Sequence, residues 1–288
     1  MCLKRLLRGT RTAVIRRSMA AMARLELLSF LLWAGVAVSS GLDLQKRVIN
    51  GAACEDSERL YHVRLLAVHG QEIFFCGGSL IDEEWILTAA HCWPGTGKMF
   101  VIINAHPDPK NNETMEINIE DRHVFKRVLR RKHDIMLLKL PQKPREPIHT
   151  VPLPDCQTDL EFGDVVRVAG HGSDAINNDL TYSNHIPRIL QCGDMTVVNC
   201  TTTQLAHHET FSYIPFGKWV CANGAEVTAD GDSGGGVEFN GHLYAVIQGS
   251  PRLAFMNPCM FLRVCKYIDW IKETMTESRN RLNCFNCG

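Results

Sequence analysis

The sequence lacks an excess of either charge and has no internal repeat, and both absences exclude broad classes of protein. Its 288 residues contain 31 Lys and Arg and 31 Asp and Glu, and from Val48 onward acidic residues outnumber basic ones by 29 to 22. This balance argues against nucleic acid as the main partner, because phosphate binding requires a concentrated excess of Lys and Arg. Without repeats or low-complexity tracts, solenoid and array folds are also excluded.

The sequence also lacks an apolar run long enough for a stable membrane span. The mostly apolar stretch Leu25–Val38 is shorter than the roughly 20 residues that a spanning helix needs. Basic residues precede it and the small residues Ser39–Gly41 follow it, so we interpret residues 1–41 as a secretory signal peptide with an upstream extension. Translation that starts at Met19 or Met22, and retention as an N-terminal signal anchor, are alternatives.

Other features of the sequence fit a secreted protein. Its twelve cysteines, in a chain that enters an oxidising compartment, predict disulfides. The tripeptides that begin at Asn112 and Asn199 match the glycosylation sequon and would mark surface loops. We therefore expect an extracellular protein, or one that is stored in a secretory granule.

From about Val48 the sequence predicts a β-rich domain. With 45% hydrophobic residues the chain can bury a substantial core. Short β-rich runs alternate with Gly, Pro, Asn and Asp, a pattern typical of all-β barrels and sandwiches. The predicted strands are Tyr61–Val68, Ile73–Phe75, Gly78–Ile81, Trp85–Thr88, Met99–Asn104, Met115–Ile119, Ile135–Leu140, Val165–Ala169 and Leu243–Gln248. One helix is predicted within Arg263–Thr276, where apolar residues recur at helical spacing.

Three short segments carry the groups that acyl transfer requires. Attack by a hydroxyl on a peptide carbonyl needs a base, an acid group that orients the base, and hydrogen-bond donors for the oxyanion. His91 follows the strand-like run Trp85–Leu87, and Asp134 begins an apolar strand. Ser233 lies in the Gly-rich sequence Gly231–Gly235. Taken singly, His91 could be a core histidine or a metal ligand and Ser233 a turn residue, but the three together favour catalysis.

In this chain order the segments resemble the chymotrypsin/trypsin family of serine proteases, and the resemblance covers nearly all of residues 47–276. It implies an all-β fold of two six-stranded antiparallel β-barrels with a C-terminal α-helix. It also implies that His91 is the general base and then the general acid, that Asp134 orients it, and that Ser233 is the nucleophile. The backbone N–H groups of Gly231 and Ser233 would form the oxyanion hole.

The resemblance further implies activation by cleavage. In the family a protease cuts after a basic residue, here Arg47, and the new α-amino group, here that of Val48, pairs with a buried carboxylate, here that of Asp232. The alternative is an exposed dibasic site without consequence. We accordingly assign residues 42–47 to an activation propeptide, 48–276 to the peptidase domain and 277–288 to a tail.

Cysteine pairing is implied by the same resemblance. The implied bridges are Cys54–Cys192, Cys76–Cys92, Cys156–Cys265 and Cys200–Cys221. Two disulfides of the family are missing from this sequence. Val166 and Phe239 stand at the two cysteine positions of one, and Ala229 stands at one cysteine position of the other. Among the remaining cysteines, Cys284 and Cys287 form a tail pair. A local or intermolecular disulfide is favoured over zinc there, because no second pair accompanies it.

The sequence departs from the trypsin pattern in the substrate pocket. Val227 stands at the position that forms the pocket floor in the family, where trypsin-like enzymes have Asp. A basic substrate side chain would therefore be buried there without a carboxylate to pair with. Cys259 would narrow the wall of the same pocket. We therefore expect aliphatic or aromatic residues to be preferred, somewhat as in the granzyme and chymase branch.

These observations predict a secreted serine endopeptidase that is made as a zymogen and acts on protein or peptide substrates. Its partners would include an activating protease, with protein protease inhibitors as a further class. A catalytically weak homologue that acts as a binding or regulatory protein is the alternative, because a fold alone does not fix function. No cofactor and no metal is implied, and we interpret the acidic stretch Glu113–Asp121 as a solvated loop.

Overall fold

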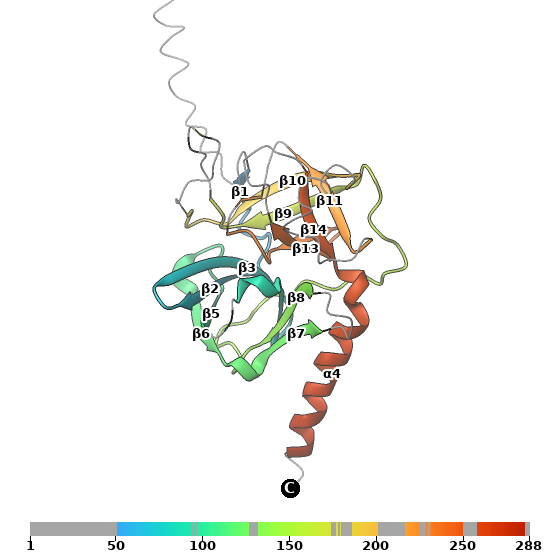
Figure 1. Ribbon diagram of the computed structural model, residues 1–288. Coiled ribbons are helices and arrows are strands. Elements are labelled where there is room, and N and C mark those ends of the chain that lie inside the picture. The colour runs from blue at the N-terminus through green and yellow to red at the C-terminus, as the bar shows by residue number, and fades with distance from the viewer. Residues whose placement is uncertain are drawn as a thin grey trace, which may run out of the picture. The chain divides into compact units, whose positions relative to one another are not determined.

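The computed structural model describes residues 51–93, 95, 97–126, 132–173, 177, 179, 186–200, 217–224, 228–229, 231–249 and 258–285. Within these residues the chain is mostly β, with one long helix towards the C-terminal end (Figure 1). The strands are β1 (Ala52–Ala53), β2 (His62–His69), β3 (Glu72–Asp82), β4 (Trp85–Thr88), β5 (Lys98–Ile103), β6 (Glu113–Ile117), β7 (Arg122–Lys126), β8 (Lys132–Lys139), β9 (Val165–Gly170), β10 (Gln191–Val198), β11 (Trp219–Asn223), β12 (Gly236–Phe239), β13 (His242–Gly249) and β14 (Cys259–Arg263). The helix is α4 (Ile268–Phe285).

In the part of the chain that the structure describes, two antiparallel sheets make up the fold. In the N-terminal sheet the strand order is β6-β5-β2-β3-β4-β8-β7. Its two ends, β6 and β7, are consecutive in the chain and are joined by the 3-10 turn Ile119–Asp121, so one bent segment reaches both β5 and β8. In the C-terminal sheet β9 pairs with both β10 and β12, which closes β9–β14 into a six-stranded barrel, and the short β1 adds to β10.

The predicted all-β fold with a C-terminal helix is confirmed. Among the described residues, the C-terminal sheet closes into a six-stranded barrel, and the N-terminal sheet forms a half-barrel, which we call the N-terminal barrel. Each sheet contains seven hydrogen-bonded strands where six were expected. The difference arises because β6 and β7 are two halves of one bent segment and because β1 is an added edge.

The core crosses from one sheet to the other. Along β2 the side chains of Val63, Leu65 and Ala67 alternate with more exposed ones and point inward, as expected for a strand with one buried face. The largest apolar cluster contains Trp85 of the N-terminal sheet together with Leu262 of the C-terminal sheet. The two barrels therefore share an apolar junction.

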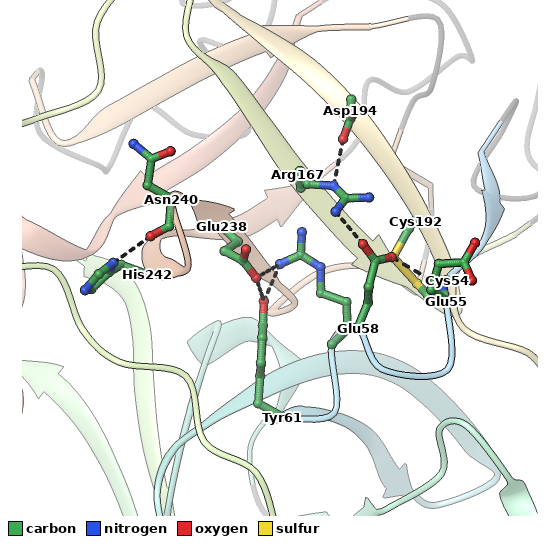
Figure 2. A network of polar contacts seen from close by, with 11 residues as sticks. Cys54, Glu55, Glu58, Tyr61, Arg167, Cys192, Asp194, Glu238, Asn240 and His242 are labelled. Atoms are coloured by element: carbon green, nitrogen blue, oxygen red, sulfur yellow. Dashed lines mark hydrogen bonds and ion pairs between the residues drawn. A yellow bond between two sulfur atoms is a disulfide. The ribbon is translucent and has the colours of Figure 1, made fainter.

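Two ion pairs tie the segment that precedes β2 to the C-terminal barrel (Figure 2). Arg167 of β9 pairs with Glu58. Arg59, which is 4% exposed, pairs with Glu238 of β12. Together with the disulfide between Cys54 and β10, these contacts fix the chain directly after its N-terminal part.

Two details of the expected elements are corrected. Ile73–Phe75 and Gly78–Ile81 belong to the single strand β3, because glycine at 78 serves close packing and not a turn. A Cβ at that position would lie 2.8 Å from Ile86 Cγ2. The predicted helix begins as the 3-10 turn Val264–Tyr267 and then continues as α4 to Phe285, past Thr276, where the predicted helix ended.

The helix α4 packs on the N-terminal barrel through Ile271, which is fully buried in the shared cluster. Arg279 of the same helix pairs with Asp82 at the end of β3, at 2.6 Å. Among the described residues, no helix combines the length and apolar character needed to cross a membrane.

We predict that Ile271→Ala lowers the free energy of unfolding by about 2–5 kcal/mol, because a cavity replaces a fully buried side chain. The matched control is Lys272→Ala in the same helix, which removes an exposed side chain and should cost less than about 0.5 kcal/mol. Urea unfolding with the disulfides intact measures both. Equal stability of the two variants would contradict the described docking of α4.

Candidate active site

A buried carboxylate fixes the orientation of His91. This histidine lies in the 3-10 turn that follows β4, and Asp134 lies in β8, which pairs with β4. Asp134 Oδ1 accepts a hydrogen bond from the backbone N–H of His91 at 2.7 Å, and Oδ2 lies 2.6 Å from His91 Nδ1. The carboxylate is 4% exposed, whereas the imidazole is 41% exposed. When Nδ1–H donates to the carboxylate, the lone pair of Nε2 is left to accept a proton.

The strand that carries Asp134 is packed against the start of the C-terminal helical segment. The hydroxyl of Tyr267 lies 2.7 Å from Nδ1 of His133, the residue before Asp134. Burial, together with the nearby Asp134 carboxylate, raises the pKa of Tyr267, so its hydroxyl stays neutral. Phe125 of β7 packs edge-on against both rings. Side chains from three elements therefore determine where β8 presents its carboxylate.

Ser233 lies in a tight turn that is packed against the N-terminal barrel. Gly231 and Gly234 have φ values of +102° and +82°, a region that favours glycine. The Ser233 carbonyl accepts a hydrogen bond from the N–H of Gly77 in β3 at 2.8 Å. A Cβ at Gly234 would lie 2.2 Å from Thr88 Oγ1, so only glycine allows this approach.

The carboxylate of Asp232 occupies what we call the glycine cradle, formed by Gly170 and Gly172. The side chain of Asp232 is buried. Its Oδ1 accepts a hydrogen bond from the N–H of Gly172 at 2.6 Å, and its Oδ2 accepts one from the N–H of Ala229 at 2.7 Å. A Cβ at Gly170 would lie 1.9 Å from Oδ1, and one at Gly172 would lie 2.6 Å from the carboxylate. Sequence reasoning missed the cradle, although the Gly-x-Gly spacing could have indicated it.

His91 and Ser233 line the same cavity, which has a volume of about 510 Å³. The N-terminal barrel contributes Ile73–Phe75 and the Cys76–Cys92 disulfide, and residues 173, 186 and 231 line the cavity from the other barrel. Ile73, Phe74 and Phe75 are 56%, 40% and 37% exposed. An imidazole and a hydroxyl thus face a binding space with an apolar wall that is open to solvent.

The other expected site residues have the following places. All four implied disulfides are present: Cys54–Cys192, Cys76–Cys92, Cys156–Cys265 and Cys200–Cys221.

Val166 and Phe239, which stand where the family has one of its missing bridges, pack in the apolar cluster of the second barrel. Cys259 is a buried free thiol in β14, and burial raises its pKa. Asn112 and Asn199 are exposed. Outside the described residues lie Cys2, Arg47, Val48, Val227 and Cys287, and the side chain of Cys284.

A metal-binding role for His91 finds no support. Within the described part of the chain, the one group of three side chains with ligand atoms close enough to share an ion is His91 with Cys76 and Cys92. The two sulfur atoms are bonded to each other, so they are not available as thiolates.

Comparison with known proteins agrees with this arrangement. A trypsin family model matches residues 48–271. Trypsin I-P1 of Gallus gallus is 29% identical over 240 residues, which cover 81% of this chain and 90% of that protein. Kallikrein-9 of Homo sapiens is 29% identical over 221 residues, which cover 70% and 81% of the two chains. A solved structure described as "Structure of GrC" has a TM-score of 0.63 at 24% identity, over 78% of this chain and 98% of that one, and supports the fold.

Fold, site and relatives together define a serine endopeptidase. More particularly, the chain belongs to the trypsin family, whose model spans most of the sequence. Its substrates are therefore proteins or peptides.

We predict that Gly170→Ala lowers peptidase activity about tenfold or more, because the new methyl group would displace the Asp232 carboxylate beside Ser233. The weakened hydrogen bonds to the carboxylate should also cost about 1.5–3 kcal/mol of stability. Val165→Ala, at an exposed position of the same strand, is the control and should keep wild-type activity. Peptide hydrolysis and urea unfolding measure both effects, and full activity of Gly170→Ala would contradict the role of the cradle.

Proposed function

We propose that the protein is a secreted serine endopeptidase that cleaves peptide bonds through an acyl-enzyme. Ser233 attacks the carbonyl, His91 takes the serine proton and passes it to the leaving amine, and Asp134 orients the imidazole and stabilises the imidazolium. The backbone N–H groups of Gly231 and Ser233 stabilise the oxyanion. Water, activated by His91, then hydrolyses the ester. This proposal is carried by the two hydrogen bonds between His91 and Asp134 beside the cavity that Ser233 lines.

The proposed precursor is a zymogen with a signal peptide in residues 1–41 and a propeptide in residues 42–47. Another protease cuts after Arg47, and the α-amino group of Val48 then pairs with Asp232. A buried carboxylate beside the nucleophile is stabilised by a cation, and a new N-terminus supplies one. The peptidase domain spans residues 48–276 and the tail residues 277–288.

The pairing of the strands supports the reach that this activation requires. Ala53 pairs with Gln191, Gln191 pairs with Gly170, and a Cβ at Gly170 would touch Asp232. The distance from Ala53 across β10 to Gly170 is two strand spacings, about 10 Å. The five residues from Ala53 back to Val48 can span roughly 17 Å when extended. The chain is therefore long enough for its new N-terminus to reach the carboxylate.

The proposed substrates have an aliphatic or aromatic residue before the cleaved bond. Val227 offers no carboxylate to a basic side chain, and Cys259 is a neutral thiol because burial raises its pKa. The exposed apolar wall Ile73–Phe75 beside the cavity also suits apolar substrate side chains.

The test of the nucleophile and of the zymogen is labelling by a fluorophosphonate, which reacts with an activated serine. We expect strong labelling of wild-type protein after treatment with a protease that cuts after Arg, and none of Ser233→Ala. Arg47→Gln should stay at the level of untreated protein. Equal labelling of Ser233→Ala and wild type would contradict the assigned nucleophile. Equal labelling of Arg47→Gln and cleaved wild type would contradict activation by cleavage, and no labelling of any form would favour a binding protein on a protease fold.

Digestion of a peptide library tests the substrate preference. Wild type should cut after aliphatic or aromatic residues, whereas Val227→Asp should gain about tenfold or more for Lys and Arg, because its carboxylate pairs with the substrate cation. Val165→Asp places the same carboxylate at an exposed position and should leave the preference unchanged. Cleavage by wild type mainly after Lys and Arg would refute the proposed preference.

A further inference from the structure

Two buried histidines face each other at the junction of the barrels. His62 is the first residue of β2 in the N-terminal barrel, and His171 directly follows β9 in the C-terminal barrel. Each is 5% exposed, and their ring centroids are 5.6 Å apart. His171 Nδ1 donates to the carbonyl of Pro187 at 3.2 Å, which leaves Nε2 as the unprotonated nitrogen. Among the described residues, no group forms a hydrogen bond with the Nε2 atom of either ring.

His62 contacts one residue whose backbone positions the turn of Ser233, and His171 is the chain neighbour of another. A Cβ at Gly77 would lie 3.0 Å from His62 Cε1, so this ring packs directly on the glycine whose N–H binds the Ser233 carbonyl. His171 lies between the two glycines of the cradle, and the N–H of Gly172 binds Asp232. Movement of either ring would therefore shift a donor that holds the turn.

The surroundings of the pair favour its neutral form. The ionisable groups that act on His62 are His171, Arg64, His106 and Arg59, all of them basic. Arg64 and His106 also act on His171. Burial, with these neighbours, lowers the pKa of His62 well below its usual value and that of His171 to about 4. The Asp232 carboxylate faces the glycines on either side of His171 and is already bound by two N–H groups. A proton taken up by the pair would thus create a buried cation among other cations, which is costly.

We propose that His62 and His171 are positioning residues that keep the nucleophile turn in place while both are neutral, and that uptake of a proton by the pair releases the turn and switches the protease off reversibly in acid. This inference rests on the proposed function of Ser233. It gives the enzyme a second proton-sensitive element besides the imidazole of His91.

The test is the acid profile of Ser233-dependent hydrolysis of a nitrophenyl ester, measured down to pH 3 on protein cleaved after Arg47 and normalised to each variant's rate at pH 8. Protonation of a single essential base lowers kcat/KM at most about tenfold per pH unit. Because the pKa of His171 is about 4, a second proton should lower the wild-type rate about tenfold further by pH 3. His62→Gln/His171→Gln places neutral amides at both positions and should lack this extra loss. The half-exposed His242, changed to Gln, is the control and should keep the wild-type profile.

Circular dichroism at each pH and the recovery of activity on return to pH 8 complete the experiment. The proposal expects native spectra and full recovery of the wild type. The proposal is overturned if the wild-type rate falls no more steeply with decreasing pH than one protonation predicts, or if the double variant shows the same extra loss of rate. It is also overturned if the extra loss of rate coincides with unfolding, since the pair would then affect stability alone. If the double variant does not fold, His171→Gln must by itself diminish the extra loss. Absence of Ser233-dependent hydrolysis at pH 8 would instead refute the proposed function.

Discussion

The arrangement of the site depends on the Asp134 carboxylate being buried, with only 4% of its side chain exposed. A buried carboxylate is costly unless hydrogen bonds replace its hydration. Here both oxygens are bound by one residue, since the backbone N–H and Nδ1 of His91 lie 2.7 and 2.6 Å away. The contacts that stabilise the charge therefore also fix the imidazole. The pairing of β4 with β8 brings the two segments together, and the disulfide from Cys92 to Cys76 anchors the turn.

A second buried carboxylate follows the same physical rule with backbone donors. Asp232 is bound by the N–H groups of Gly172 and Ala229, and the absence of side chains at the glycine cradle makes the approach possible. The turn that carries Ser233 is thus fixed from two directions, by the cradle behind Asp232 and by Gly77 at its own carbonyl. The nucleophile turn and the junction of the barrels form one packed unit, which is why a change in charge at that junction would be felt at the serine.

The parts of this arrangement that could be predicted from sequence are the local ones. His91, Asp134 and Ser233 stand in short motifs in a recognisable order, and β2 was predicted as a strand. The strands β11 and β14, which are buried at four of their five residues, were not among the predicted strands. The predicted strands were divided between Phe75 and Gly78, whereas Gly77 and Gly78 lie within one strand and make contacts with Ser233 and β4. Such roles depend on partners far away in the chain, which no local pattern reports.

The most direct test of the account is the kcat of the activated Asp134→Asn variant on a peptide substrate. An amide at this position would donate an N–H to His91 Nδ1 and so favour the tautomer that carries its proton on Nε2, which cannot take the serine proton. Binding of the substrate should be left largely intact. The account predicts a fall in kcat of about 10⁴ with little change in KM. A kcat within about tenfold of wild type would contradict it, because the buried carboxylate would then not be what prepares His91 for catalysis.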